Sequence, residues 1–181
     1  MTLVQALSSA KTEEDGKDAY VKAIGLKKYS KGLVDIQAEN IWFEAKEAPT
    51  AAFAMFAQLL FYVRSARESG PAHLPPLLAA IDREKAAILE TADAMSMRHD
   101  DGIDWPKAAS GVSKTCIAQV AAHIDGQFST FTIANQESES LSQIKSALID
   151  DRIISKVEAK SAVCFGHRRA KHPQCASLWP D

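Results

Sequence analysis

The feature that most constrains the fold is an apolar stretch at residues 51–63, in which Gln58 is the only strongly polar side chain. A membrane span needs about twenty residues, and a shorter run of this kind is typical of a buried core helix. A proline precedes the stretch and a Gly-Pro pair follows it, so we predict a helix from about Thr50 to about Glu68. Because this helix is apolar on nearly every side, we expect other elements to cover most of it.

Short strands are predicted on both sides of that helix. In the two strands before the helix the side chains alternate between two faces, and the two strands after it are short apolar runs on either side of a polar turn. The predicted strands are residues 33–37, 41–47, 77–81 and 86–89, with residues 128–133 as a strand or a loop. In the first strand Val34 and Ile36 are expected on one face and Asp35 on the other, and in the second strand Glu44 and Lys46 share a face.

Capping and periodicity predict further helices that begin at Thr12, Ser113 and Ser140. The order of elements predicts an α/β fold, with a small mixed sheet flanked by helices and a helical C-terminal extension. The composition changes late in the chain. We therefore predict one domain over residues 1–135, followed by a helix and a basic Cys/His-containing tail over residues 136–181.

Composition excludes several classes of function. The 181 residues include 21 basic and 23 acidic side chains, so a net charge of −2 gives no overall positive field to attract a polyanion. No glycine-rich phosphate loop is present, which argues against an ATPase or a dinucleotide enzyme. Three cysteines make no disulfide framework, and residues 1–11 lack the pattern of a secretory signal. We expect a cytoplasmic protein with no membrane partner.

An acidic residue two positions before a lysine occurs three times, at Asp15, Glu44 and Glu158. Only Glu44-Ala-Lys46 lies on a predicted strand, and Asp35 lies on the strand just before it. Two carboxylates beside an ammonium group suit Mg²⁺, which prefers oxygen ligands, and the hydrolysis of a phosphodiester. The alternative is a salt-bridged hairpin on a solvated face.

A second pair of polar residues lies on the apolar helix, where Gln58 and Tyr62 are four positions apart and share one face. A buried amide and a buried phenol need hydrogen-bond partners, which a neighbouring polar site would supply. The alternative is a helix edge with incidental polar residues.

The order of Asp35, Glu44-Ala-Lys46 and Gln58-x-x-x-Tyr62, after a helix that contains Glu13 and Glu14, resembles the PD-(D/E)xK nuclease superfamily and its RecB-like branch. Residues 10–135 are similar to the N-terminal nuclease region of bacterial restriction–modification proteins that carry an adenine-specific DNA methyltransferase. The resemblance implies a restriction-endonuclease-like core and a Mg²⁺-dependent deoxyribonuclease, with Mn²⁺ as an alternative ion. It also implies that Asp35 and Glu44 are metal ligands, that Lys46 is the catalytic lysine, and that Gln58 and Tyr62 support the site.

Several points stay open in the sequence. Either Glu13 or Glu14 could complete the site. The resemblance implies DNA as a partner, and a methyltransferase or specificity domain or subunit as a further one, because no methyltransferase signature is present in this sequence. The oligomeric state is also open, with a homodimer as one arrangement. The alternative function is a non-catalytic DNA-binding or assembly module of a restriction–modification protein.

The tail contains a separate set of metal-ligand residue types, Cys164, His167, His172 and Cys175. Their pair spacings are ones that zinc can use, but the spacer between the pairs is short. Two interpretations follow, a small zinc site within an adaptor protein or a basic tail without metal.

Overall fold

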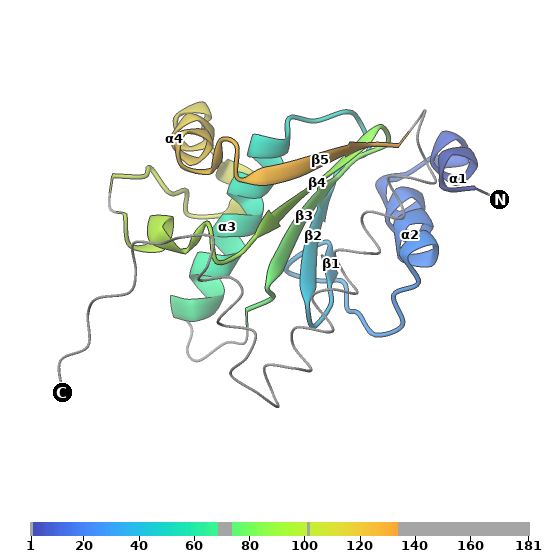
Figure 1. Cartoon of the computed structure of the whole chain (residues 1–181), viewed down its shortest axis with the longest axis horizontal. Helices are drawn as coiled ribbons and strands as arrows, with labels where there is room; N and C mark the ends of the chain where they lie inside the picture. The colour runs from blue at the N-terminus through green and yellow to red at the C-terminus, as the bar shows by residue number, and fades with distance from the viewer. Residues whose placement is uncertain (1, 69–73, 101, 134–181) are drawn as a thin grey trace, which may run out of the picture.

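The structure is a computed structural model that describes residues 2–68, 74–100 and 102–133. A five-stranded mixed sheet lies between two layers of helices, which confirms the predicted α/β class (Figure 1). The predicted helical extension and the proposed zinc ligands of the tail lie outside the described residues. Within the described residues, no helix is both long enough and apolar enough to cross a membrane.

The elements follow one another in a simple order. The helices are α1 (Leu3–Ser9), α2 (Glu13–Ile24), α3 (Ala52–Glu68) and α4 (Lys114–Ile124), with 3-10 helices η1 (Met95–His99) and η2 (Ala109–Gly111). The strands are β1 (Ile36–Gln37), β2 (Ile41–Ala45), β3 (Leu77–Ile81), β4 (Lys85–Glu90) and β5 (Phe128–Thr132). Helices α2, α3 and α4 and strands β3 and β4 match their predicted ranges closely. Residues 128–132 form a strand, which was one of the two alternatives for this segment. Helix α1 was not predicted.

The strands lie in the sheet in the order of the sequence. Strands β2 and β3 are parallel, and α3 connects them, whereas every other neighbouring pair is antiparallel. Parallel pairing brings the carboxyl ends of β2 and β3 together, with Ala45 opposite Ile81 and the Lys46 N–H donating to the Ile81 carbonyl at 3.0 Å. Residues that follow these two strands therefore gather at one edge.

Each face of the sheet carries its own apolar core. Helices α3 and α4 cover one face, where Trp42, Leu78 and Leu89 pack against buried side chains of α3. Helices α1 and α2 cover the other, where Phe43, Ile81 and Ile88 meet residues such as Leu7 and Tyr20 (Figure 1). This double burial explains why β3 and the middle of β4 are apolar at every position.

Helix α2 begins and ends where its sequence predicts. Thr12 accepts a hydrogen bond from the Asp15 N–H, and the Asp15 carboxylate accepts one from the Thr12 N–H, which completes a capping box. Gly25 ends the helix in the left-handed conformation with φ 79°. The capping box thus fixes where the first turn of α2 begins, and with it the positions of Glu13 and Glu14 on the helix.

The prediction for the first strand was wrong in two respects. Strand β1 contains only Ile36 and Gln37, because residues 32–35 form a bend. Val34 and Ile36 therefore do not share a face: Val34 packs in the core under α3, and Ile36 packs in the core under α2. Alternation of side chains holds only where the backbone is extended.

Strand β2 is also shorter than predicted, since it ends at Ala45 and residues 46–48 leave the sheet. Glu44 nevertheless lies on the strand, and Lys46 directly follows it. The bend before β1 and the end of β2 are the two places from which the predicted acidic residues project.

Candidate active site

The candidate active site lies at the carboxyl end of β2, where side chains from α2, the bend before β1 and β2 meet. We call the six charged residues there the charged cluster: Glu13, Glu14, Lys17, Asp35, Glu44 and Lys46. The structure thus brings together Asp35, Glu44 and Lys46, which sequence reasoning selected. It also adds Lys17, which sequence reasoning set aside.

Asp35 is fixed by two interactions. Its Oδ2 atom accepts a hydrogen bond from the Ala45 N–H at 2.8 Å, and its Oδ1 atom lies 2.7 Å from Lys17 Nζ. The first contact ties the bend before β1 to the end of β2. The Asp35 side chain is one-fifth exposed, so its remaining lone pairs are open to water.

Glu44 is the most buried carboxylate of the charged cluster, with a side chain that is 7% exposed. Burial raises its pKa, and the charges of Asp35 and Glu13 raise it further, whereas the hydrogen bond to Lys46 acts in the opposite direction. Burial by itself would lower the pKa of Lys46, but the bond to Glu44 and the nearby carboxylates raise it above its ordinary value. Glu44 and Lys46 are therefore a close ion pair in a negative environment.

Lys17 is the residue that sequence reasoning missed. Its ammonium group lies 2.8 Å from Glu13, 2.8 Å from Glu14 and 2.7 Å from Asp35, and its side chain is only 7% exposed. Burial acts to lower its pKa, but the bonds to these carboxylates outweigh burial and raise it. Lys17 belongs to Asp15-Gly-Lys17, one of the acid-x-Lys matches, and its i, i+4 spacing from Glu13 was the available signal.

The two polar residues of helix α3, Gln58 and Tyr62, lie in different environments. Tyr62 is partly buried, and burial raises its pKa, with further contributions from the charges of Glu44 and Asp35. The charges of Glu44 and Asp35 therefore act on the Tyr62 hydroxyl. Gln58 instead donates from Nε2 to the Ala109 carbonyl of η2 at 3.4 Å, and among the described residues its buried Oε1 has no partner.

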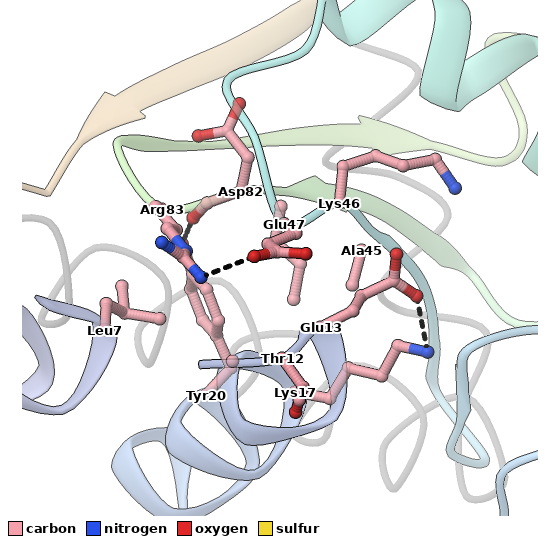
Figure 2. A pocket seen from close by; sticks show the side chains of 12 residues that line it. Leu7, Thr12, Glu13, Lys17, Tyr20, Ala45, Lys46, Glu47, Asp82 and Arg83 are labelled. Atoms are coloured by element: carbon pink, nitrogen blue, oxygen red, sulfur yellow. Dashed lines mark hydrogen bonds and ion pairs between the residues drawn. The ribbon is translucent and has the colours of Figure 1, made fainter. Parts of the chain in front are cut away.

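A small cavity of about 10 Å³ adjoins the charged cluster, beneath the first turns of α2. This is room for about one water molecule. Figure 2 shows the charged ends of Glu13, Lys17 and Lys46 on one side of this region, and Asp82 and Arg83 on the other. Arg83 donates to Glu47 at 3.0 Å, so the second side is closed by its own ion pair.

The donor set of the charged cluster fits a divalent cation that prefers oxygen. Mg²⁺ is usually bound through one or two carboxylates, with waters and substrate phosphates as the other ligands. Asp35 and Glu44 supply two carboxylates whose mutual repulsion raises the pKa of Glu44, and a cation would relieve that repulsion. Among the described residues, no group of three or more His, Cys, Asp or Glu side chains is arranged to hold a metal ion.

The arrangement combines acceptors for a cation with an ammonium group, Lys46, whose side chain is 31% exposed. Carboxylates could hold a cation, and the ammonium group could meet an anionic substrate or orient a water molecule. These chemical roles are inferred only from the arrangement of the residues in the charged cluster. Comparison of the chain with models of protein families, with curated proteins and with solved structures found no match.

Proposed function

We propose that the chain is a Mg²⁺-dependent DNA endonuclease domain that hydrolyses phosphodiester bonds as part of a cytoplasmic restriction–modification system. The observation that carries the proposal is the meeting of Asp35, Glu44 and Lys46 at the end of β2, with Asp35 held by the Ala45 N–H. The order and spacing of these residues also resemble the PD-(D/E)xK pattern.

In this proposal Asp35 and Glu44 hold the metal ion, which supplies Lewis-acid activation of a phosphodiester and of a bound water. Lys46 neutralises developing charge on the phosphate or orients the attacking water. The charges of Glu44 and Asp35 raise the pKa of Tyr62, after the larger effect of burial, whereas the described contact of Gln58 is to η2. A methyltransferase or specificity domain or subunit would recognise the target sequence.

The test is cleavage of supercoiled plasmid DNA in Mg²⁺ or Mn²⁺, with a chelator as the negative control. We expect Asp35→Asn and Glu44→Gln to abolish nicking, and Lys46→Arg to reduce it by about 100-fold or more, since a planar guanidinium replaces a compact ammonium. The matched control is Glu47→Gln, because Glu47 is close in sequence but pairs with Arg83 instead. Wild-type nicking by Glu44→Gln would disprove the site.

One observation favours a second candidate function, a non-catalytic DNA-binding or assembly module. Lys17 contacts three carboxylates and Lys46 contacts a fourth, so each carboxylate of the charged cluster already has an ammonium partner within the chain. Such a network can stabilise a fold without turnover. This alternative predicts DNA binding with no nicking at any concentration of Mg²⁺ or Mn²⁺.

A further inference from the structure

A basic and partly apolar loop lies between α2 and β1. This basic loop, residues 27–33, has the sequence Lys-Lys-Tyr-Ser-Lys-Gly-Leu, and all of its residues are exposed. Tyr29 is 41% exposed and Leu33 is 62% exposed, and these are the most exposed large apolar side chains in the described part of the chain. The loop therefore combines positive charge with apolar surface in contact with water.

The backbone of the basic loop is held at several points. Leu26 packs against the core under α2, and its N–H donates to the Val21 carbonyl at 3.1 Å. Ser30 and Gln37 exchange two backbone hydrogen bonds of 2.8 Å each, which makes an isolated bridge at the edge of the sheet. The side chains between these points are presented on a fixed support.

The lysines of the basic loop differ in their partners. Lys31 binds Glu14 at 2.7 Å and Asp18 at 2.8 Å, so it anchors the loop to α2. Lys27 and Lys28 have no carboxylate partner among the residues that the structure describes. Their charges are not neutralised within that part of the chain, and they directly precede Tyr29 in the sequence.

The basic loop also lies beside the charged cluster. Glu14 contacts Lys31 through one oxygen and Lys17 through the other, and Lys17 contacts Asp35. Leu33 is two residues before Asp35 in the chain. Figure 1 shows the loop running from the end of α2 to β1, on the side of the sheet that α2 covers.

We propose that the basic loop binds a DNA strand, with Lys27 and Lys28 contacting phosphates and Tyr29 stacking on an unpaired base. Cations beside an exposed aromatic ring are the combination that proteins use to bind single strands, whereas membrane-surface segments are usually amphipathic helices. The choice of DNA as the polyanion rests on the proposed function. The loop would hold the strand next to the charged cluster.

The test is fluorescence anisotropy of the full chain with a labelled single-stranded oligonucleotide, in a chelator so that no cleavage occurs. We expect Lys27→Gln/Lys28→Gln to reduce the slope of log affinity against log salt by about 1.4, because each phosphate contact on a single strand contributes about 0.7. Tyr29→Ala should weaken binding by about 5- to 150-fold, and Tyr29→Phe should restore it.

The matched control is Lys11→Gln/Lys22→Gln, which removes the same charge from exposed lysines around α2 outside the basic loop. Equal salt slopes for the two double variants would overturn the proposal, as would unchanged binding by Tyr29→Ala. Loop-dependent binding to phosphatidylserine vesicles in place of the oligonucleotide would overturn it in favour of a membrane surface.

The two proposals fail separately. Loop-dependent binding without nicking in Mg²⁺ would support the loop and contradict the endonuclease. If the protein nicks DNA but the substitutions in the basic loop leave its DNA affinity unchanged, the endonuclease proposal is supported and the loop proposal is overturned.

Discussion

Glu44 is a residue whose charge costs the fold free energy, because burial and the neighbouring carboxylates raise its pKa above the ordinary value of 4.5. The folded chain therefore holds this proton more tightly than the unfolded chain. The stability that this provides is fully present below pH 4.5 and is lost as pH rises through the raised pKa. A group placed at such a cost is typical of a functional site.

We predict that Glu44→Gln becomes more stable relative to the wild type as pH rises from 4.5 through the raised pKa of Glu44. The glutamine amide cannot ionise, so the variant does not lose the stability that the wild type loses when Glu44 ionises. Urea unfolding of both proteins at several pH values measures the difference. Glu47→Gln serves as the control, since Glu47 is half exposed, and a constant difference for Glu44→Gln would contradict the raised pKa.

The residues of the site were partly predictable from the sequence. Asp35, Glu44 and Lys46 were selected because their spacing on neighbouring strands placed them at one edge, and they do meet there. Lys17 was not selected. Helical spacing shows that Lys17 lies on the same face of α2 as Glu13, but it does not show that this face packs beside Asp35. The contact of Gln58 with η2 depends on a segment 51 residues away, which no local pattern reveals.

At the scale of elements, Asp82 joins three parts of the fold at the end of β3. Its Oδ1 atom accepts hydrogen bonds from the N–H groups of Glu84 and Lys85, and its Oδ2 atom accepts one from Thr50, just before α3. Its backbone carbonyl accepts a 2.6 Å hydrogen bond from the Tyr20 hydroxyl of α2. One buried residue thus positions the β3–β4 turn, the start of α3 and the helix that carries Lys17.

We predict that Asp82→Ala lowers the free energy of unfolding by about 3 kcal/mol, because three part-buried N–H groups lose a charged acceptor. Asp82→Asn should lose less, since its side-chain oxygen can still accept in the turn. Asp93→Ala, at an exposed aspartate, is the matched control. Chemical denaturation measures all three, and equal losses for Asp82→Ala and Asp93→Ala would show that the turn does not depend on this carboxylate.

The elements with strong periodicity or turn signals were predicted well, and the short ones were not. Helices α2 and α4 have capping residues, and β3 and β4 form the predicted hairpin. Helix α1 was missed although Thr2 and Gln5 form a capping box, because a helix of seven residues gives little periodic signal. The first strand was predicted too long, because the bend that carries Asp35 is set by packing on both faces.

At the scale of the whole molecule, the last described residues complete both the sheet and a core. Strand β5 pairs with β4 along five positions, and Phe128 packs against Phe53 and Phe56 of α3. Ile133 is 1% exposed in the core under α2, and its N–H donates to the Glu84 carbonyl at 2.8 Å. Among the described residues, β5 thus adds to the sheet, and Phe128 and Ile133 add to one core each.

We predict that a fragment of residues 1–135 folds without residues 136–181 and unfolds cooperatively, with a urea midpoint close to that of the full chain. A fragment that ends at Gln127 is the control, because it lacks β5 and leaves the edge of β4 and the ring faces of Phe53 and Phe56 uncovered. Far-ultraviolet circular dichroism and binding of a hydrophobic dye distinguish the two. Dye binding by the longer fragment would show that residues after 135 cover one of the cores, and the predicted domain boundary would then be wrong.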